Sequence, residues 1–305
     1  MLRILLGMLL ASVRGEAGAF DLGETRHLGF INLPMPTAGG LQLWGDVFWG
    51  GGWRIQQHVW SGHHRLLDAN NVRRAWGDFS ACRAVFAATD AHADQPPIRR
   101  LVIALAGMGR TRRALAPLRQ ALGPEDVLVL VAYPSTRASV AKHAMCLRRL
   151  LADLPDVERV AIVTHSLGAL VARVALAAPA GDRARWPRID GVIMLFPPNR
   201  GAALADRWHR TWPYRWLLGP AGQELTTAAA GVVPLPCDPF VVIAGGRGDG
   251  RGRNRRLDGD NDGTVQVAET WLPGAEQHHR IDVGHTFGMG DARVLAAVRA
   301  ALARF

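Results

Sequence analysis

The sequence predicts an α/β fold: a mostly parallel central sheet with helices on both of its faces. Beyond residue 98, short apolar runs without polar alternation recur, at 101–106, 127–132, 160–164, 192–196 and 240–244. Such runs are typical of strands that are buried on both faces, as in parallel sheets. Stretches of helical periodicity separate them, near 112–122, 137–153 and 167–178. Strands that alternate with helices in this way favour βαβ units, and a last helix over 292–305 closes the domain.

The segment before residue 98 has a different pattern, rich in glycine and tryptophan. Alternate residues are mostly apolar over 41–49, which predicts a strand, and the runs 53–60 and 64–67 predict a hairpin. Asp78 stands before a helical pattern and is the expected helix start. We expect 20–97 to add antiparallel strands and a helix to the start of the sheet. Residues 20–305 would then form one domain.

The first 19 residues resemble a secretory signal peptide. Arg3 precedes an apolar run over 4–13, and the Ala-Gly-Ala at 17–19 is a cleavage motif. The run is too short to span a bilayer. Because Arg14 and Glu16 are unusual in a cleavage region, an interfacial anchor or a buried helix is the alternative. We expect an exported (periplasmic or secreted) or membrane-associated protein, with a cytoplasmic location as the alternative.

The 305-residue chain is basic, with 36 Lys and Arg against 26 Asp and Glu and a net charge of +10. Lys142 is its only lysine and lies outside any Gly-Lys-Ser/Thr sequence, which excludes a phosphate-binding P-loop. The arginines are scattered and accompany no nucleic-acid-binding motif, so we expect no nucleic-acid partner. A weak attraction to anionic lipid headgroups is the fairer inference, and it favours peripheral contact with a membrane. Cys82, Cys146 and Cys237 are too far apart in sequence for a Cys-x-x-Cys site, and their pairing is left open.

Thr164-His165-Ser166-Leu167-Gly168 contains the candidate nucleophile. The pentapeptide stands where an apolar strand is expected to end and an Ala-, Leu- and Val-rich helix to begin. A sharp turn at that junction exposes a serine hydroxyl above the sheet, and the helix N-terminus beneath it favours developing negative charge. The alternative is a serine that only caps the helix. We expect Ser166 to be a nucleophile and His165 to be structural.

Asp262 and His285 are the acid and base that Ser166 would need. They follow the serine in the order Ser, Asp, His, 23 residues apart, with room between them for a short helix and one strand. His285 would take the serine proton, and Asp262 would fix the imidazole tautomer. Asp262 is preferred because Asp-Gly-Thr-Val predicts a turn that enters regular structure. The rivals in the same region are Asp258, Asp260, His278 and His279.

Two main-chain N–H groups are candidates for binding the oxyanion of a tetrahedral intermediate. The first is that of Leu167, directly after the candidate nucleophile. The second is that of Met108, in the Gly107-Met108-Gly109 loop after the first parallel strand. A dinucleotide-binding fingerprint is excluded there, because Arg112 stands where the third glycine should be.

Together, the motifs around Ser166, Asp262 and His285 resemble the α/β-hydrolase superfamily, and more narrowly bacterial lipases and esterases. Tyr133-Pro134-Ser135 and 196–201 are also similar to loops of that group, and the resemblance covers roughly 98–305. It implies an α/β-hydrolase fold with a Ser-Asp-His triad. Two residues depart from the usual pattern. Thr164 replaces the first glycine of Gly-x-Ser-x-Gly, and Ala106 replaces a histidine of the first loop.

In such hydrolases a lid often occupies the position of 201–236. Trp208, Trp212 and Trp216 recur there every four residues, which is one helical face, although Pro213 would break or kink the helix. One interpretation is an aromatic lid, with Tyr214, that lines an acyl pocket or touches lipid. The other is ordinary core packing.

The resemblance implies a serine hydrolase that cleaves carboxylic esters, of a lipid or another acyl compound, through an acyl-enzyme intermediate. We expect a small-molecule or lipid ester as the partner, and neither a metal nor an organic cofactor. An acyltransferase or thioesterase with the same triad is the alternative within this class, because the pocket selects the acceptor. A non-catalytic binding protein on the same fold is the alternative outside it.

Overall fold

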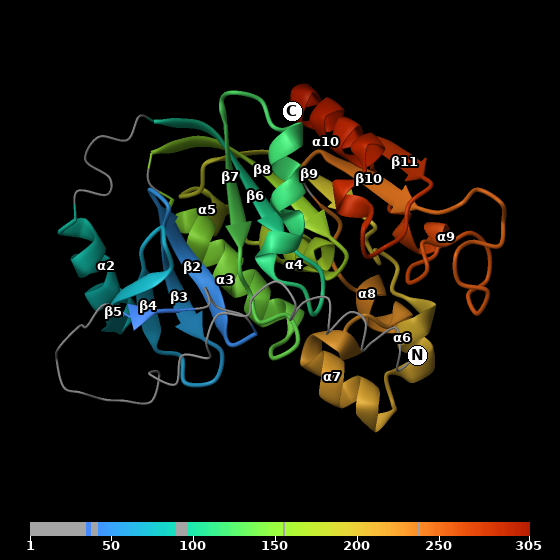
Figure 1. Cartoon of the computed structure of the whole chain (residues 1–305), viewed down its shortest axis with the longest axis horizontal. Helices are drawn as coiled ribbons and strands as arrows, with labels where there is room; N and C mark the ends of the chain where they lie inside the picture. The colour runs from blue at the N-terminus through green and yellow to red at the C-terminus, as the bar shows by residue number, and fades with distance from the viewer. Residues whose placement is uncertain (1–34, 38–41, 90–96, 155, 237) are drawn as a thin grey trace.

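The computed structural model describes residues 35–37, 42–89, 97–154, 156–236 and 238–305. In these ranges the chain forms two sheets (Figure 1). The larger has six strands in the order β11-β10-β9-β8-β6-β7, and all neighbours pair in parallel. The strands are β6 (Ile98–Leu105), β7 (Asp126–Val131), β8 (Val157–His165), β9 (Arg188–Leu195), β10 (Phe240–Gly245) and β11 (Gln277–Ile281). The predicted parallel sheet is therefore confirmed.

Helices cover both faces of the parallel sheet because its strands are apolar on both. Leu101 and Ile103 of β6 lie in one core with α3 and α4, whereas Val102 and Ala104 lie in a second core with η3 and α10. Successive side chains of a strand point to opposite faces, so two-sided burial requires an unbroken apolar run. These helices are η3 (Arg112–Ala121, a 3-10 helix), α3 (Val140–Ala152), α4 (Leu167–Leu176) and α10 (Ala292–Arg304), each in a predicted position. Shorter helices are α5 (Ala180–Arg183), α9 (Val267–Thr270) and η4 (Gly288–Gly290).

The second sheet is antiparallel, in the order β1-β5-β4-β3-β2. Its strands are β1 (Met35–Pro36), β2 (Trp44–Gly50), β3 (Trp53–His58), β4 (His64–Leu67) and β5 (Val72–Gly77). Helix α2 (Phe79–Ala87) follows, and its N-cap is Asp78, as predicted. Phe48, Ile55, Leu66 and Phe86 fill a separate core between this sheet and α2. The Nζ of Lys142 in α3 donates to the carbonyl of Val59 at 2.5 Å, which ties this sheet to the larger one's helical layer.

The expectation that 20–97 extends the parallel sheet is wrong for the strands that the structure describes. They lie on the β7 side as a sheet of their own (Figure 1), joined to it by one main-chain hydrogen bond, from the Asp46 N–H to the Ala132 carbonyl at 2.8 Å. The Asp46 carboxylate accepts the Ala132 N–H at 2.8 Å, and Pro134 has no N–H to offer. The side chain therefore takes the donor that the next ladder bond would have used, and pairing stops.

Three short helices lie together beyond one end of the parallel sheet (Figure 1): α6 (Ala203–Trp208), α7 (Trp212–Gln223) and α8 (Thr227–Gly231). The expectation of one helical face for the tryptophans is wrong, because Trp208 ends α6 and Trp212 begins α7. Pro213 occupies the first turn of α7, where a missing N–H costs nothing. The kink falls instead at Gly219, whose φ is 59°.

No helix among the described residues has both the length and the apolar character needed to cross a membrane. The predicted signal peptide or anchor, 1–19, lies outside the described residues.

Candidate active site

Ser166 stands at a sharp turn between β8, which ends at His165, and α4, which begins at Leu167. Its φ of 53° and ψ of −122° lie in a sparsely populated region that is unfavourable for a residue with a Cβ. Gly168 makes the turn possible, because a Cβ there would lie 2.6 Å from the Leu105 carbonyl oxygen. Thr164 is accommodated in place of the usual glycine, since its buried hydroxyl donates to the Ile193 carbonyl of β9 at 3.4 Å. The turn is the one that the sequence predicted.

The structure brings Ser166, His285 and Asp262 into one hydrogen-bonded row. Ser166 Oγ lies 3.0 Å from His285 Nε2, and His285 Nδ1 lies 2.7 Å from Asp262 Oδ2. The other carboxylate oxygen of Asp262 accepts the N–H groups of Thr264 and Val265 at 2.9 and 2.8 Å. At most 8% of any of the three residues is exposed. A carboxylate fixed in this way holds the Nδ1–H tautomer and leaves Nε2 free to accept the serine proton.

The residues that rivalled Asp262 and His285 in the sequence make other contacts. Asp260 accepts the main-chain N–H groups of Arg247 and Gly248, both at 2.7 Å, so it shapes the loop after β10. His278 and His279 lie on β11 and contact Thr270 and Gln277. Asp258 is exposed. The span between Asp262 and His285 contains one short helix, α9, and one strand, β11, as the spacing predicted.

Met108 and Leu167 both lie beside Ser166. The Met108 N–H donates to no group in the described part of the chain, and Leu167 opens α4, where N–H groups have no partner within the helix. Gly107 is required next to them, because a Cβ there would lie 2.6 Å from His165 Nδ1 and 3.0 Å from the serine Cβ. Within the described residues the two N–H groups thus have no acceptor, and free donors on either side of the serine are what an oxyanion site needs.

The loop that carries Met108 is braced by residues that sequence reasoning did not assign. The hydroxyl of Tyr133 donates to the Ala106 carbonyl, and the Gly109 N–H donates to Ser135 Oγ at 3.0 Å. Gln42 accepts the Ser135 hydroxyl at 3.2 Å. The tyrosine therefore holds the loop at the position where Ala106 replaces the usual histidine. Tyr133-Pro134-Ser135 was visible as a motif, but nothing in it indicated which loop it would contact.

Comparison with solved structures finds the lipase BlEst2 from Bacillus licheniformis in its mature form, with a TM-score of 0.52 and 18% identity over 68% of this chain and 94% of that chain. The propeptide form of BlEst2 matches with a TM-score of 0.52 and 19% identity over 68% of this chain and 51% of that one. The metagenomic carboxyl esterase MGS0156 matches with a TM-score of 0.49 and 16% identity over 70% and 79%. No protein-family model and no curated protein matches the sequence. The chain has the α/β-hydrolase fold.

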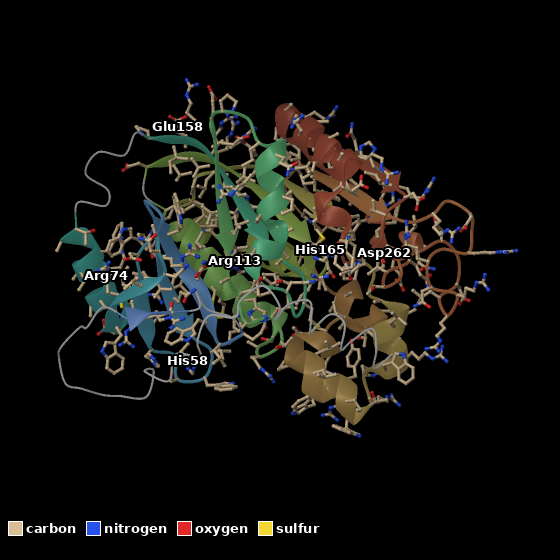
Figure 2. All side chains as sticks on the ribbon, in the orientation of Figure 1. His58, Arg74, Arg113, Glu158, His165 and Asp262 are labelled. Atoms are coloured by element: carbon tan, nitrogen blue, oxygen red, sulfur yellow. The ribbon has the colours of Figure 1, made fainter. Side chains whose placement is uncertain are left out.

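In this α/β-hydrolase fold, His165 is a second buried imidazole beside the candidate base. Figure 2 labels it and Asp262 at the same end of the parallel sheet. Burial, and next the neighbouring His285, lower the pKa of His165 well below its ordinary value, so the ring is neutral at pH 7. Its Nε2 then donates to the carbonyl of His285 at 3.0 Å. The structure therefore supports the structural role expected of it, with one addition: it holds the backbone of the base.

A cavity of about 710 Å³ opens above Ser166, within the usual range for a small-molecule site. Apolar side chains from α6 and α7 form one wall, among them Leu204, Trp208, Leu217 and Leu218. Tyr214 also lines it, with its hydroxyl on the Gly222 carbonyl at 2.9 Å. Within the described ranges, no three His, Cys, Asp or Glu side chains are grouped so as to hold a metal.

The aromatic residues of 201–236 were interpreted either as a lid that lines an acyl pocket or touches lipid, or as core packing. Trp208 and Tyr214 face the cavity, as an acyl-pocket lining would. Trp212 and Trp216 are 76% and 67% exposed, which excludes core packing for both. A hydrogen bond joins the end of this segment to α3, because Glu224 accepts the Val140 N–H at 2.5 Å.

Proposed function

We propose that this protein is a serine hydrolase that cleaves carboxylic esters, with Ser166 as nucleophile, His285 as general base and Asp262 as the orienting acid. The observation that carries the proposal is the continuous row of hydrogen bonds from Ser166 Oγ through His285 to Asp262, buried at the floor of a cavity. A serine that served only as a helix cap would need neither the strained φ nor the histidine.

The reaction follows from the positions of the donors and acceptors. As Ser166 Oγ attacks the ester carbonyl carbon, its proton passes to His285 Nε2, and Asp262 stabilises the imidazolium that forms. The Met108 and Leu167 N–H groups receive the carbonyl oxygen as it becomes negative. When the acyl C–O bond breaks, His285 gives the proton to the alcohol oxygen and an acyl-enzyme remains. A water molecule, deprotonated by the same histidine, then releases the acid.

The apolar wall of the cavity supports an acyl chain as the group held during catalysis. Leu204, Leu217 and Leu218 offer contact area without hydrogen-bond donors, which suits a hydrocarbon chain. We therefore propose lipid or other acyl esters as substrates. The exposed Trp212 and Trp216 suit peripheral contact of an exported protein with a membrane surface.

The test is hydrolysis of p-nitrophenyl esters from acetyl to palmitoyl by the wild type, Ser166→Ala and the control Ser80→Ala. Ser80 is an exposed serine of α2, and its hydroxyl donates to the Asp78 carboxylate at 2.7 Å. We expect Ser166→Ala to lose more than about a thousandfold in kcat and its labelling by a fluorophosphonate probe, while Ser80→Ala keeps both. A wild type that cleaves no ester and takes no label would refute the proposal and favour a binding protein. Faster release with an added alcohol or thiol acceptor would instead indicate acyl transfer.

A further inference from the structure

The lining of the cavity also carries positive charge. Three arginines line it: Arg110 after the oxyanion loop, Arg207 in α6, and Arg256 in the loop that leads to Asp262. No aspartate or glutamate of the described chain lines the cavity. The three cations come from separate elements, so their convergence is a property of the folded site.

None of these three arginines has a carboxylate partner among the residues that the structure describes. Partners are available nearby, since Arg247 pairs with Asp249 at 3.0 Å and Arg253 with Asp282 at 2.7 Å. Arg256 forms no such pair, although the exposed Asp258 is only two residues away. Among the described residues, the cation of Arg256 is therefore left without a carboxylate at the edge of the cavity.

Arg110 is the most informative of the three because it is partly buried. Its guanidinium donates one hydrogen bond, to the Thr286 carbonyl at 3.1 Å, and its carbon lies 5.9 Å from the centre of the Phe287 ring. A guanidinium has five N–H donors, so most of the donors of Arg110 have no acceptor among the residues that the structure describes. Burial lowers the pKa of Arg110, which reports the cost of holding this cation away from water. The attraction between Arg110 and an anion bound in the cavity would offset that desolvation cost.

The position of Arg110 indicates which half of an ester the anion belongs to. His285 protonates the departing alcohol oxygen, so the alcohol portion lies on the histidine side of Ser166. Arg110 is bonded to Thr286, the residue directly after that histidine, and Asn254 and Arg256 line the same cavity from the loop that carries Asp262. The acyl portion of the ester would then contact the apolar side chains of α6 and α7 that line the cavity.

We propose that the preferred substrates are acyl esters whose alcohol portion carries an anionic phosphate or carboxylate group, which Arg110 and Arg256 bind. Arginine suits such groups because its planar fork meets two of their oxygens at once. This inference rests on the proposed function and adds the chemistry of the leaving alcohol to it.

The experiment compares matched esters that differ only in the phosphate: 1-butyrylglycerol 3-phosphate with 1-butyrylglycerol, and 1-oleoylglycerol 3-phosphate with 1-oleoylglycerol. We expect kcat/KM to favour the phosphate ester by roughly ten- to a hundredfold, the worth of one charge-assisted hydrogen bond. A preference in both pairs identifies a soluble anionic group as sufficient. A preference in the oleoyl pair alone assigns the anion to a lipid headgroup.

The variants are Arg256→Gln and the matched control Arg255→Gln, which changes an exposed neighbouring arginine that does not line the cavity. We expect Arg256→Gln to lower the phosphate-to-neutral ratio by about tenfold and Arg255→Gln to leave it unchanged. A ratio is used because it is insensitive to the fraction of folded enzyme. A wild-type ratio near one, or equal effects of the two variants, overturns the inference while the ester hydrolase stands. A wild type that cleaves neither these esters nor p-nitrophenyl butyrate refutes both.

Discussion

Ser166→Gly is expected to abolish hydrolysis and yet unfold at a higher temperature than Ser166→Ala. Both variants lack the hydroxyl, so both lose the same hydrogen bond to His285. They differ in the Cβ, which alanine keeps in a backbone conformation with φ 53° and ψ −122°. Such a sparsely populated conformation costs an L-residue about 1–3 kcal/mol. Glycine avoids that cost but adds about 0.4–1 kcal/mol of conformational entropy to the unfolded chain.

The difference leaves Ser166→Gly more stable than Ser166→Ala by about 1 kcal/mol, or a rise in Tm of about 2–4 °C for a domain of this size. Differential scanning calorimetry of the two inactive proteins measures it. The control is Ala296→Gly, at an exposed position inside α10, where glycine should cost about 1 kcal/mol relative to alanine. If Ser166→Gly melts below Ser166→Ala, as Ala296→Gly should melt below the wild type, then the turn stores no strain and the reasoning fails.

Three further outcomes are expected. Tyr133→Phe should lower kcat by roughly tenfold and change KM little, because the loop that carries the oxyanion donors loses its brace; an unchanged kcat in steady-state assays would contradict this. Gly219→Ala should destabilise the fold by more than about 2 kcal/mol in urea unfolding, since its Cβ would lie 1.8 Å from the Thr136 carbonyl oxygen at a φ of +59°, whereas Gly231→Ala meets no heavy atom within 4 Å and should be tolerated. The free energy of unfolding should fall as the pH drops from 6.5 to 4. Burial lowers the pKa of His143 and of His64 to about 4, so the folded state keeps both rings neutral while the unfolded chain takes up protons below about 6.5. His143 contributes roughly 3 kcal/mol to this loss, and urea unfolding at the two pH values should show a smaller fall for His143→Asn than for the wild type.

The parallel sheet could be predicted because two-sided burial leaves a local signature. Val102 and Ile103 face different helical layers and are both apolar, so no polar residue interrupts the run. The turn at Ser166 was equally local, since strand, small residues and helix follow one another within a few positions. The order of the motifs along the chain then predicted Asp262 and His285 as the acid and the base. The folded chain places both within hydrogen-bond distance of their partners.

Other features depend on contacts between distant segments and have no local signature. The alternation in 41–49 is the same whether the strand joins the parallel sheet or forms another. The choice depends on the Asp46 carboxylate meeting the Ala132 N–H, 86 residues away. Tyr133 and Ser135 acquire a role only where they meet Ala106 and Gly109. The spacing of four between the tryptophans was misleading for a local reason. Pro213 lies in the first turn of a new helix, so Trp208 and Trp212 belong to different helices and share no helical face.

The single lysine gives this protein an internal reporter. Lys142 supplies the only side-chain amine in the sequence, and that amine is hydrogen-bonded to the Val59 carbonyl across the junction between the antiparallel sheet and α3. An amine-reactive reagent therefore modifies one side chain, and it does so fastest when that contact opens. The rate of modification at increasing urea would time the separation of the N-terminal sheet from the rest of the fold, without any introduced label site.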